Sequence, residues 1–318
     1  MKTYVLGAPS ATHAVIVGAG IMGADVAVVL LRAQCRVTLV EPGAQAQATA
    51  GERIEENLRH VQSPGNRHRL EFCADLDAVP WSTVHLVIEC IPEVLAAKQA
   101  LFARLEALAP PGVVLASNSS GFPISQIAQG CTSAQRMVGL HFFMPAHIVP
   151  LVEVVRGPAT DSQLCDDLAH FMRRCGSVPI QVRKDVPGFI GNRLQHALAR
   201  EAFSLIEQGV ATPEDIDAAV RFGFGFRFLA AGPILQKEHA GIDTHARAAA
   251  TIYPTLSNAM APAPVLADKL LEGNIGMKSG RGFYVWDAAN MAQEKARYAK
   301  ALRDALAILA DDLPPIEP

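Results

Sequence analysis

Short runs of apolar residues alternate with longer helical patterns through the first part of the chain. The apolar runs are bounded by glycine, proline or charged residues, and they cover residues 14–18, 37–40, 84–88, 113–116, 137–140, 151–155 and 178–182. Such runs are typical of strands buried on both faces of a sheet. Helical patterns lie between them, at 44–60, 94–108 and 161–175. We therefore predict an α/β domain with a mostly parallel sheet over residues 1–186.

The pattern changes after the polar and proline-containing segment Lys184–Gly188. Apolar residues then recur at helical spacing from Phe189 to Gln208, and Thr212 with Pro213 starts another helix in good capping style. A final amphipathic pattern covers 288–309, after which we expect the tail around 313–315 to be frayed. We therefore predict an all-helical C-terminal domain over residues 187–318.

A glycine-rich turn follows the first predicted strand directly. Its sequence, GAGIMG, contributes Gly18, Gly20, Ile21, Met22 and Gly23. Between a strand and a helix, such glycines let a pyrophosphate approach the helix N-terminus. Glu41 ends the second strand about 20 residues downstream, where an acid binds both ribose hydroxyls and disfavours a 2′-phosphate. The sequence therefore predicts a Rossmann-type domain that prefers NAD to NADP.

Polar residues follow the next two predicted strands. Glu93 lies just beyond 84–88, and Asn118 and Ser120 lie beyond 113–116. Ligands of open α/β sheets bind at the carboxyl ends of the strands, so these residues are candidates for ligand contacts. The alternative for the serines is capping of the helix predicted at 123–128.

One histidine and one carboxylate occupy consecutive apolar runs. His141 ends the run at 137–140, and Glu153 lies inside the run at 151–155. A glutamate in a buried strand is costly unless it is paired, and His141 is the nearest partner if the chain folds back between the runs. A carboxylate on one imidazole nitrogen fixes the tautomer and supports the charge when the other nitrogen takes a proton. A structural histidine and a water-facing glutamate remain the alternative.

The composition narrows the class of protein. Of the 318 residues 19% are charged, and the net charge is -3. This gives no basic surplus for nucleic acid, and no apolar run is long enough to span a membrane. The six cysteines show no CxxC spacing, which favours small buried residues in a reducing, cytoplasmic compartment; we expect no metal site.

Six motifs in order resemble the L-3-hydroxyacyl-CoA dehydrogenase superfamily, which includes the gulonate dehydrogenase (lambda-crystallin) and carnitine dehydrogenase branches. They are GAGIMG, IECIPE with Lys98, SNSSGFPIS, GLHFFMP, LVEVV and PGFIGNR, within residues 13–286. The resemblance implies that His141 is the catalytic base, Glu153 its partner, and Ser120 and Asn192 contacts of the reacting hydroxyl. It further implies that Glu93, Lys98 and Asn118 line the cofactor, and that the helical domain forms a homodimer.

Three departures from the family pattern concern the substrate. The segment between Glu41 and Leu70 looks short beside the helical hairpin that supports CoA in the acyl-CoA enzymes. Met144 stands where the family usually has asparagine. Arg227, in Gly225-Phe226-Arg227 and followed by Gly232-Pro233, resembles the gulonate and carnitine branch. We read Arg227 as a buried cation that binds a substrate carboxylate. The alternative is an ion pair within the protein, with Glu238 or with an acid across a dimer interface.

These observations predict an NAD-dependent dehydrogenase that oxidises a secondary 3-hydroxyl to a ketone by hydride transfer. The substrate expected is a small hydroxy carboxylate, and the phenylalanines of 221–229 are compatible with a ring. One alternative is a short-chain L-3-hydroxyacyl-CoA (3-hydroxybutyryl-CoA) dehydrogenase of fatty acid metabolism. A non-catalytic, crystallin-like NAD-binding protein is an alternative of another class.

Overall fold

The chain folds into two compact units in the computed structural model, which describes residue 4 and residues 6–318. The first unit extends to Asn192 and also takes in residues 311–318. The second unit comprises residues 193–310.

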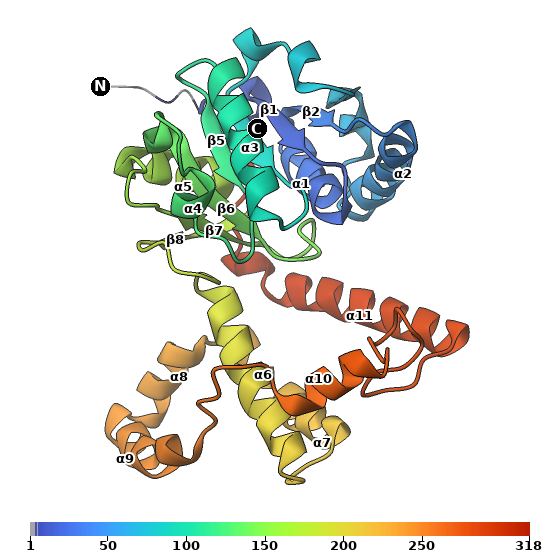
Figure 1. Ribbon diagram of the computed structural model, residues 1–318, viewed down its shortest axis with the longest axis vertical. Coiled ribbons are helices and arrows are strands. Elements are labelled where there is room, and N and C mark those ends of the chain that lie inside the picture. The colour runs from blue at the N-terminus through green and yellow to red at the C-terminus, as the bar shows by residue number, and fades with distance from the viewer. Residues whose placement is uncertain (1–3, 5) are drawn as a thin grey trace. The chain divides into compact units, whose positions relative to one another are not determined.

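The first unit contains an eight-stranded sheet (Figure 1). The strand order is β3-β2-β1-β4-β5-β6-β7-β8, and all neighbours are parallel except β6 and β7. The strands are β1 His13–Val17, β2 Arg36–Val40, β3 Leu70–Cys73, β4 Leu86–Glu89, β5 Val114–Ser117, β6 Met137–Phe142, β7 Leu151–Val155 and β8 Val178–Val182. This confirms the predicted Rossmann-type, mostly parallel sheet.

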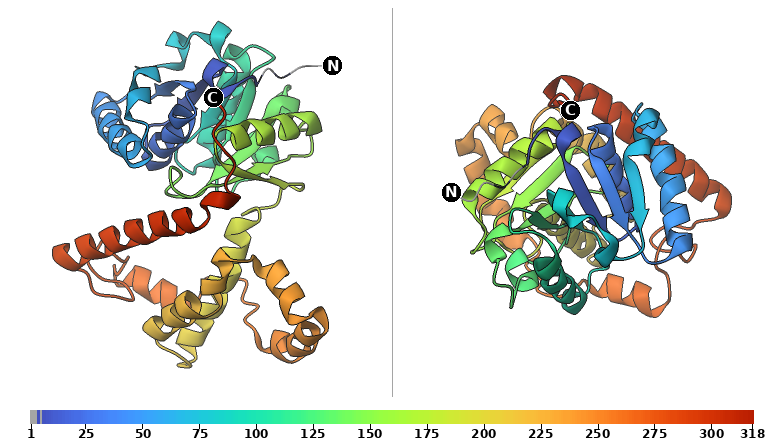
Figure 2. Two further views of the ribbon diagram at one scale, coloured as in Figure 1. Left: turned by 180° about the vertical axis from the view of Figure 1, so that it is seen from behind. Right: turned by 90° about the horizontal axis from the view of Figure 1, so that it is seen from above.

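Helices cover both faces of this sheet (Figure 2). One face packs against α1 Ile21–Arg32, α2 Ala44–His60 and α5 Ser162–Arg174. The other packs against α3 Leu95–Leu108 and α4 Ile124–Ile127. Successive residues of β1 alternate between the two cores, with Ala14 and Ile16 in the first and Val15 and Val17 in the second. Because strand side chains alternate, a strand covered on both faces is apolar at most positions, as the run at 14–18 is.

The C-terminal tail makes contacts with the first unit just beyond the segment 313–315 that was predicted to be frayed. Ile316 forms a bridge with Cys175, and the Glu317 amide donates to the Arg174 carbonyl at 2.9 Å. A Cβ on Gly176 would stand 2.7 Å from the Ile316 side chain, so the glycine leaves room for it. The contacts come from a segment distant in sequence, which local composition does not reveal.

The second unit is all-helical, as predicted. Its helices are α6 Gly191–Glu207, which begins just before the unit, α7 Pro213–Ala218, α8 Pro233–Ala240, α9 Ile242–Ile252, α10 Pro264–Leu271 and α11 Ala288–Ile308. Thr212 caps α7 by accepting from the Asp215 amide at 3.2 Å. Among the described helices none is by itself long and apolar enough to cross a bilayer; residues 213–240 reach that length only across an 87° bend.

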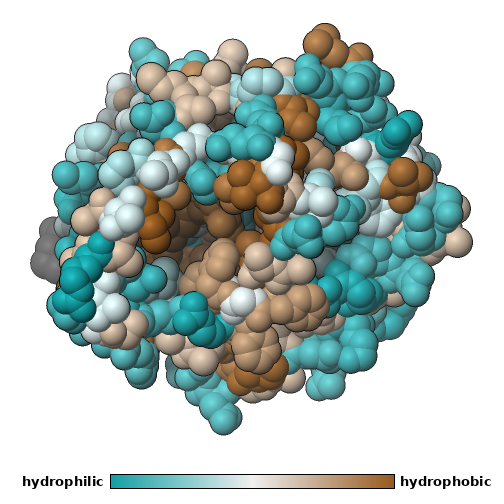
Figure 3. Space-filling model, turned by 90° about the horizontal axis from the view of Figure 1, so that it is seen from below, coloured by the Kyte–Doolittle hydropathy of each residue, from teal (hydrophilic) through white to brown (hydrophobic). Residues whose placement is uncertain are grey.

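Large apolar side chains of the helical unit remain exposed in the single chain. No side chain between residues 193 and 310, all of which are described, is buried. Phe222 is 72% exposed and Phe226 is 69% exposed, so the phenylalanines of 221–229 are not core residues. Figure 3 shows hydrophobic side chains at the surface of the molecule seen from below. The alternation of phenylalanine and glycine therefore belongs to a surface of the single chain.

Candidate active site

The glycine-rich turn between β1 and α1 is shaped so that side chains would not fit. Gly18 has φ +102°, and a Cβ there would stand 2.8 Å from the Cys90 carbonyl oxygen. A Cβ on Gly23 would stand 1.9 Å from the Gly18 carbonyl oxygen. Gly20 caps α1 without a side-chain hydrogen bond, which leaves the first amides of the helix to an anion. The turn thus fits a dinucleotide pyrophosphate.

Glu41 lies beside this turn at the end of β2. Its Oε2 accepts from the Ala19 amide at 3.2 Å, and its Oε1 accepts from the Gly43 amide at 3.1 Å. These contacts fix the carboxylate, and each oxygen retains a lone pair for a ribose hydroxyl. A phosphate at the same place would meet a fixed negative charge.

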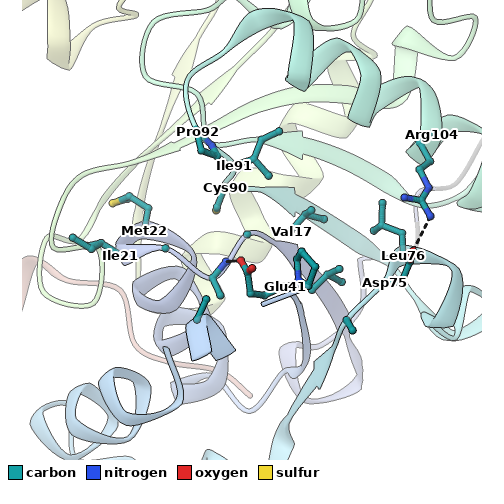
Figure 4. A pocket seen from close by; sticks show the side chains of 17 residues that line it. Val17, Ile21, Met22, Glu41, Asp75, Leu76, Cys90, Ile91, Pro92 and Arg104 are labelled. Atoms are coloured by element: carbon teal, nitrogen blue, oxygen red, sulfur yellow. Dashed lines mark hydrogen bonds and ion pairs between the residues drawn. The ribbon is translucent and has the colours of Figure 1, made fainter. Parts of the chain in front are cut away.

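A cavity of about 770 Å³ opens between the turn and the ends of β2 and β4 (Figure 4). Ile21 and Met22 lie toward one end, and Arg104 reaches Asp75 at the other (Figure 4). The Arg104 Nη2 atom lies 2.7 Å from Asp75 Oδ1. Four of the five predicted turn residues, Gly18, Gly20, Ile21 and Met22, line this cavity together with Glu41, whereas Gly23 does not line it. Its position at the carboxyl ends of parallel strands, and the turn and carboxylate that line it, fit NAD.

Glu93 and Lys98 are linked to the turn that carries Ser120. Glu93 Oε1 accepts from the Ser119 hydroxyl at 2.5 Å and from the Ser120 and Gly121 amides at 3.1 and 3.0 Å. Lys98 is 1% exposed, and its Nζ lies 3.1 Å from Glu93 Oε2. Thus Lys98 stands behind Glu93 and holds it, and the Lys98 ammonium does not line the cavity of Figure 4.

A buried glutamate that the sequence argument missed completes this network. Glu89 ends β4 and is fully buried. One of its oxygens lies 2.6 Å from Lys98 Nζ, and the other accepts from the Ser117 hydroxyl at 2.6 Å. Hydrogen bonds and the Lys98 charge lower the pKa of Glu93, although burial acts in the opposite direction. A carboxylate at the end of an apolar run was the available signal for Glu89.

Asn118, Ser120 and Asn192 come together at the ends of β5 and β6. The Asn118 side-chain oxygen accepts from the Phe142 amide at 2.9 Å, one residue beyond His141. The Asn192 side-chain nitrogen donates to the Ser120 carbonyl at 3.1 Å. The structure therefore brings Asn192, from the first turn of α6, to the polar turn after β5.

His141 and Glu153 form a direct pair across β6 and β7. They are register partners in the antiparallel ladder, and His141 Nδ1 lies 2.8 Å from Glu153 Oε2. Both are buried, at 4% and 0% exposure. The Phe143 and Phe189 rings lie with their centroids 4.7 and 5.6 Å from the imidazole centroid.

Backbone amides at the start of α6 complete the setting of Glu153. Its Oε1 accepts from the Ile190 and Gly191 amides, each at 2.9 Å. Burial alone would raise the pKa of Glu153, but the hydrogen bonds from His141 and these two amides outweigh it and lower the pKa. An ionised Glu153 keeps the proton of a neutral imidazole on Nδ1, so Nε2 is the nitrogen that can take a proton. The contribution of the two amides was not predicted, because it arises from chain folding after Pro187.

Arg227 belongs to the second unit. It is exposed, which contradicts the expectation of a buried cation. In the described part of the chain no carboxylate forms an ion pair with it, and the alternative pairing with Glu238 is absent. The short segment that carries it ends in a 3₁₀ helix at Phe226–Leu229.

A Rossmann unit with a ribose-directed carboxylate defines the class of NAD-dependent oxidoreductases. Family comparison makes the assignment specific: the model for the 3-hydroxyacyl-CoA dehydrogenase NAD-binding domain matches residues 13–186, and the model for its C-terminal domain matches residues 188–286. The chain belongs to the 3-hydroxyacyl-CoA dehydrogenase family and is an NAD-dependent dehydrogenase. The family, the enzyme class and the cofactor expected from the sequence are confirmed.

Similar proteins act on two kinds of substrate. The chain is 33% identical to the 5-formyl-3-hydroxy-2-methylpyridine 4-carboxylate 5-dehydrogenase of Mesorhizobium japonicum, over 92% of this chain and 96% of that one. A crystal structure of an enzyme of that name, described as an NAD+ dependent dismutase, aligns with TM-score 0.85 at 32% identity, covering 93% and 96%. The 3-hydroxybutyryl-CoA dehydrogenase of Mycobacterium tuberculosis is 36% identical over 85% of this chain and 97% of that one.

Proposed function

We propose that the chain oxidises the secondary hydroxyl of a small hydroxy carboxylate, with His141 as the general base. The observation that carries this is the 2.8 Å contact between His141 Nδ1 and Glu153 Oε2 in a buried, apolar setting. Glu153 is itself fixed by two amides, so the imidazole has a defined tautomer and orientation. A positioned base of this kind contributes about 10²–10⁴ in rate.

Separate residues bind the cofactor and move the proton. Gly18, Gly20 and Gly23 receive the pyrophosphate of NAD, and Glu41 binds the ribose. Bound NAD supplies the acceptor for the hydride. His141 Nε2 takes the hydroxyl proton, and Glu153 stabilises the imidazolium.

Two further side chains orient the reacting oxygen. Ser120 and Asn192 contact it, and the contact between Asn192 and the Ser120 carbonyl holds the two residues together. Three other residues act through these side chains and do not contact the substrate. Asn118 fixes the end of the strand that carries His141, whereas Glu93, held by Lys98, fixes the turn that carries Ser120. Orientation of this kind supplies much of the remaining rate enhancement.

The charges around α2 favour a free acid over a CoA ester. Arg53 pairs with Asp25 at 2.9 Å, and Arg67 pairs with Glu55 at 3.4 Å. Arg69 donates to the Gln34 carbonyl at 2.8 Å. These cations are already engaged, and α2 is followed by a short 3₁₀ helix at Pro64–Arg69 in place of a long hairpin. The segment therefore offers little to the phosphates of CoA.

A carboxylate on the substrate would suit Arg227. The side chain is an exposed guanidinium with no carboxylate partner among the described residues, and its fork can bond both oxygens of an acid. The relative from Mesorhizobium japonicum is named for a pyridine carboxylate, which is a small ring-bearing acid. A short-chain 3-hydroxyacyl-CoA is the second candidate, favoured by the relative from Mycobacterium tuberculosis, which is named for 3-hydroxybutyryl-CoA. That substrate would give the enzyme a role in fatty acid metabolism.

A substrate panel tests the proposal. Wild type and His141→Ala are assayed with NAD against 3-hydroxybutyrate, L-carnitine, L-gulonate and 3-hydroxybutyryl-CoA, which carry a secondary hydroxyl. They are also assayed against 5-formyl-3-hydroxy-2-methylpyridine 4-carboxylate, whose aldehyde must first add water to give a hydrate that can lose hydride. We expect the highest kcat/KM with a free acid, and no turnover by His141→Ala although it still binds NADH. If kcat/KM is higher with 3-hydroxybutyryl-CoA than with every free acid, the proposal of a free hydroxy acid as substrate is wrong. If His141→Ala keeps more than about a tenth of kcat, the base is wrong, because a general base is worth at least about a hundredfold.

We also infer that residues 187–318 mediate homodimer formation and shape the substrate side of the site, while residues 1–186 bind NAD. Exposed apolar side chains such as Phe222, Phe226 and Leu271, at 72, 69 and 87% exposure, support an interface on the helical unit. Sedimentation of wild type and of Phe226→Glu tests this, with the variant expected to shift toward monomer. The composition supports a cytoplasmic location.

A further inference from the structure

A buried polar cluster connects the cofactor helix α1 with the loop that joins the two catalytic strands. Asp25, in α1, is fully buried. Arg53 Nε and Nη2 donate to its two oxygens at 2.9 and 3.3 Å, and Asn57 donates to it at 3.0 Å. The fourth member is His147, whose Nδ1 lies 3.5 Å from Asp25 Oδ1.

His147 belongs to the segment 143–150, which joins β6 and β7. The segment leaves β6 directly after His141 and Phe142 and enters β7 before Glu153. His147 is 5% exposed, and among the described residues its Nδ1 forms no hydrogen bond and makes only the 3.5 Å approach to Asp25 Oδ1. A buried polar ring nitrogen without a polar neighbour would cost free energy, and the Asp25 carboxylate is the polar group that it approaches. This contact therefore favours one position of the segment relative to α1.

The segment carries the aromatic wall of the proposed base. Phe143 lies against the His141 ring at 4.7 Å, and a Cβ on Gly191 would stand 2.3 Å from the Phe143 ring. A displacement of the segment would therefore move the contacts of His141, and also the place where Glu153 meets the amide of Gly191.

Stability alone is a weak reason for such a cluster. Buried ion pairs can often be replaced by apolar residues without loss of stability, because desolvation offsets the attraction. They do fix position, since only one arrangement satisfies the charges. The sheet core around α1 is otherwise apolar, with Ala24, Val26, Ala27 and Val28 all at 0% exposure.

We propose that Asp25 and His147 are positioning residues, which hold the segment 143–150, and with it the setting of His141, in register with the cofactor helix. The inference rests on the proposed role of His141. Asp25 acts through His147 and does not touch substrate.

His147→Leu breaks the link while Arg53 and Asn57 still satisfy Asp25, so the fold is retained. His147→Asn places an amide nitrogen near the position of Nδ1 and is the rescue variant. His13→Leu is the matched control, because His13 is also buried, at 3%, and bonds Thr83 and Thr38 at 2.9 and 2.8 Å. It lies at the opposite, amino end of the parallel strands.

The first measurement, hydrogen exchange with NADH bound, needs no substrate. The amides of Ile148 and Val149 donate to the Pro145 carbonyl at 3.0 and 2.9 Å and report the order of the segment. We expect their exchange to accelerate at least about tenfold in His147→Leu, to return toward wild type in His147→Asn, and to be unchanged in His13→Leu. Unchanged exchange in His147→Leu would overturn the inference.

Kinetics with NAD and either 3-hydroxybutyryl-CoA or the best hydroxy acid of the panel give the second measurement. His147→Leu should lose about tenfold in kcat, since misplacement by about 1 Å costs up to about 10²-fold, while its Kd for NADH stays the same. A lower melting temperature with unchanged kcat is expected for His13→Leu. The same result for His147→Leu would show that His147 contributes only to stability. His141→Ala in the same assays separates the two claims: an inactive His141→Ala with a fully active His147→Leu refutes only the positioning role, whereas an active His141→Ala refutes the proposed base.

Discussion

Replacement of Glu153 by glutamine tests how the tautomer of His141 is set. Glu153 Oε1 accepts two backbone amides, from Ile190 and Gly191, and Oε2 faces His141 Nδ1. Glutamine offers one carbonyl oxygen and one amide nitrogen in place of the two oxygens. The nitrogen cannot face the two backbone donors without an unfavourable contact, so the carbonyl oxygen takes the place of Oε1. The amide nitrogen then faces Nδ1.

This orientation reverses the hydrogen bond to the imidazole. Nδ1 becomes the acceptor, the neutral ring carries its proton on Nε2, and Nε2 can no longer take the substrate proton. The negative charge that stabilises the imidazolium is lost as well. Loss of a general base costs about 10²–10⁴ in rate, and we expect a fall of about 10³ in kcat. The fold should lose only about 1 kcal/mol, the difference between a charge-assisted and a neutral hydrogen bond.

Steady-state kinetics with NAD and the best acid of the panel measure kcat, and fluorescence titration measures the Kd for NADH. Nitrogen NMR of the His141 ring reports the tautomer directly. Glu106→Gln is the control, because Glu106 also accepts backbone amides, from Thr132 and Ser133 at 3.2 and 2.5 Å, in a turn outside the proposed site. A Glu153→Gln enzyme with kcat within about tenfold of wild type and an unchanged tautomer would refute the reasoning.

Three further outcomes are expected. Glu41→Ala should narrow the preference for NAD over NADP in kcat/KM by relieving repulsion of the 2′-phosphate, and equal efficiency of wild type with both cofactors would contradict the role of Glu41. Arg227→Met should raise KM for the acid about ten- to a hundredfold, from loss of roughly 1.5–3 kcal/mol, with little change in melting temperature; an earlier melt with normal KM would assign Arg227 to structure. The pKa of Asp25 is lowered in the fold: burial raises it, but the close approach of His147 and the hydrogen bonds from Arg53 outweigh burial. The ionised Asp25 therefore contributes to the free energy of unfolding above its unfolded pKa, about 3.9, and this contribution is lost as pH falls through the folded pKa. Urea unfolding should show that the free energy of unfolding falls less below pH 4 in Asp25→Asn than in wild type.

The sequence by itself determined the local features of this protein. Buried strands are mostly apolar, so the run at 37–40 predicted β2 closely, and the run at 178–182 predicted the partly buried edge strand β8. The glycines of the turn were readable because only glycine tolerates the φ of Gly18 and the contact at Gly23. Glu153 was readable because a lone carboxylate in an apolar strand needs a partner.

Tertiary structure decided what depends on segments distant in sequence. The register of the antiparallel pair β6 and β7 places His141 opposite Glu153, and the chain after Pro187 adds the Ile190 and Gly191 amides. The same holds for the tail, where Ile316 meets Cys175, and for His147, which reaches Asp25 on another element. Arg227 was expected to be buried from its aromatic neighbours, but it is exposed, since exposure depends on what other parts of the fold cover. The local sequence shows that burial of a polar or charged side chain would cost free energy, whereas the partner that offsets this cost is known only from the folded chain.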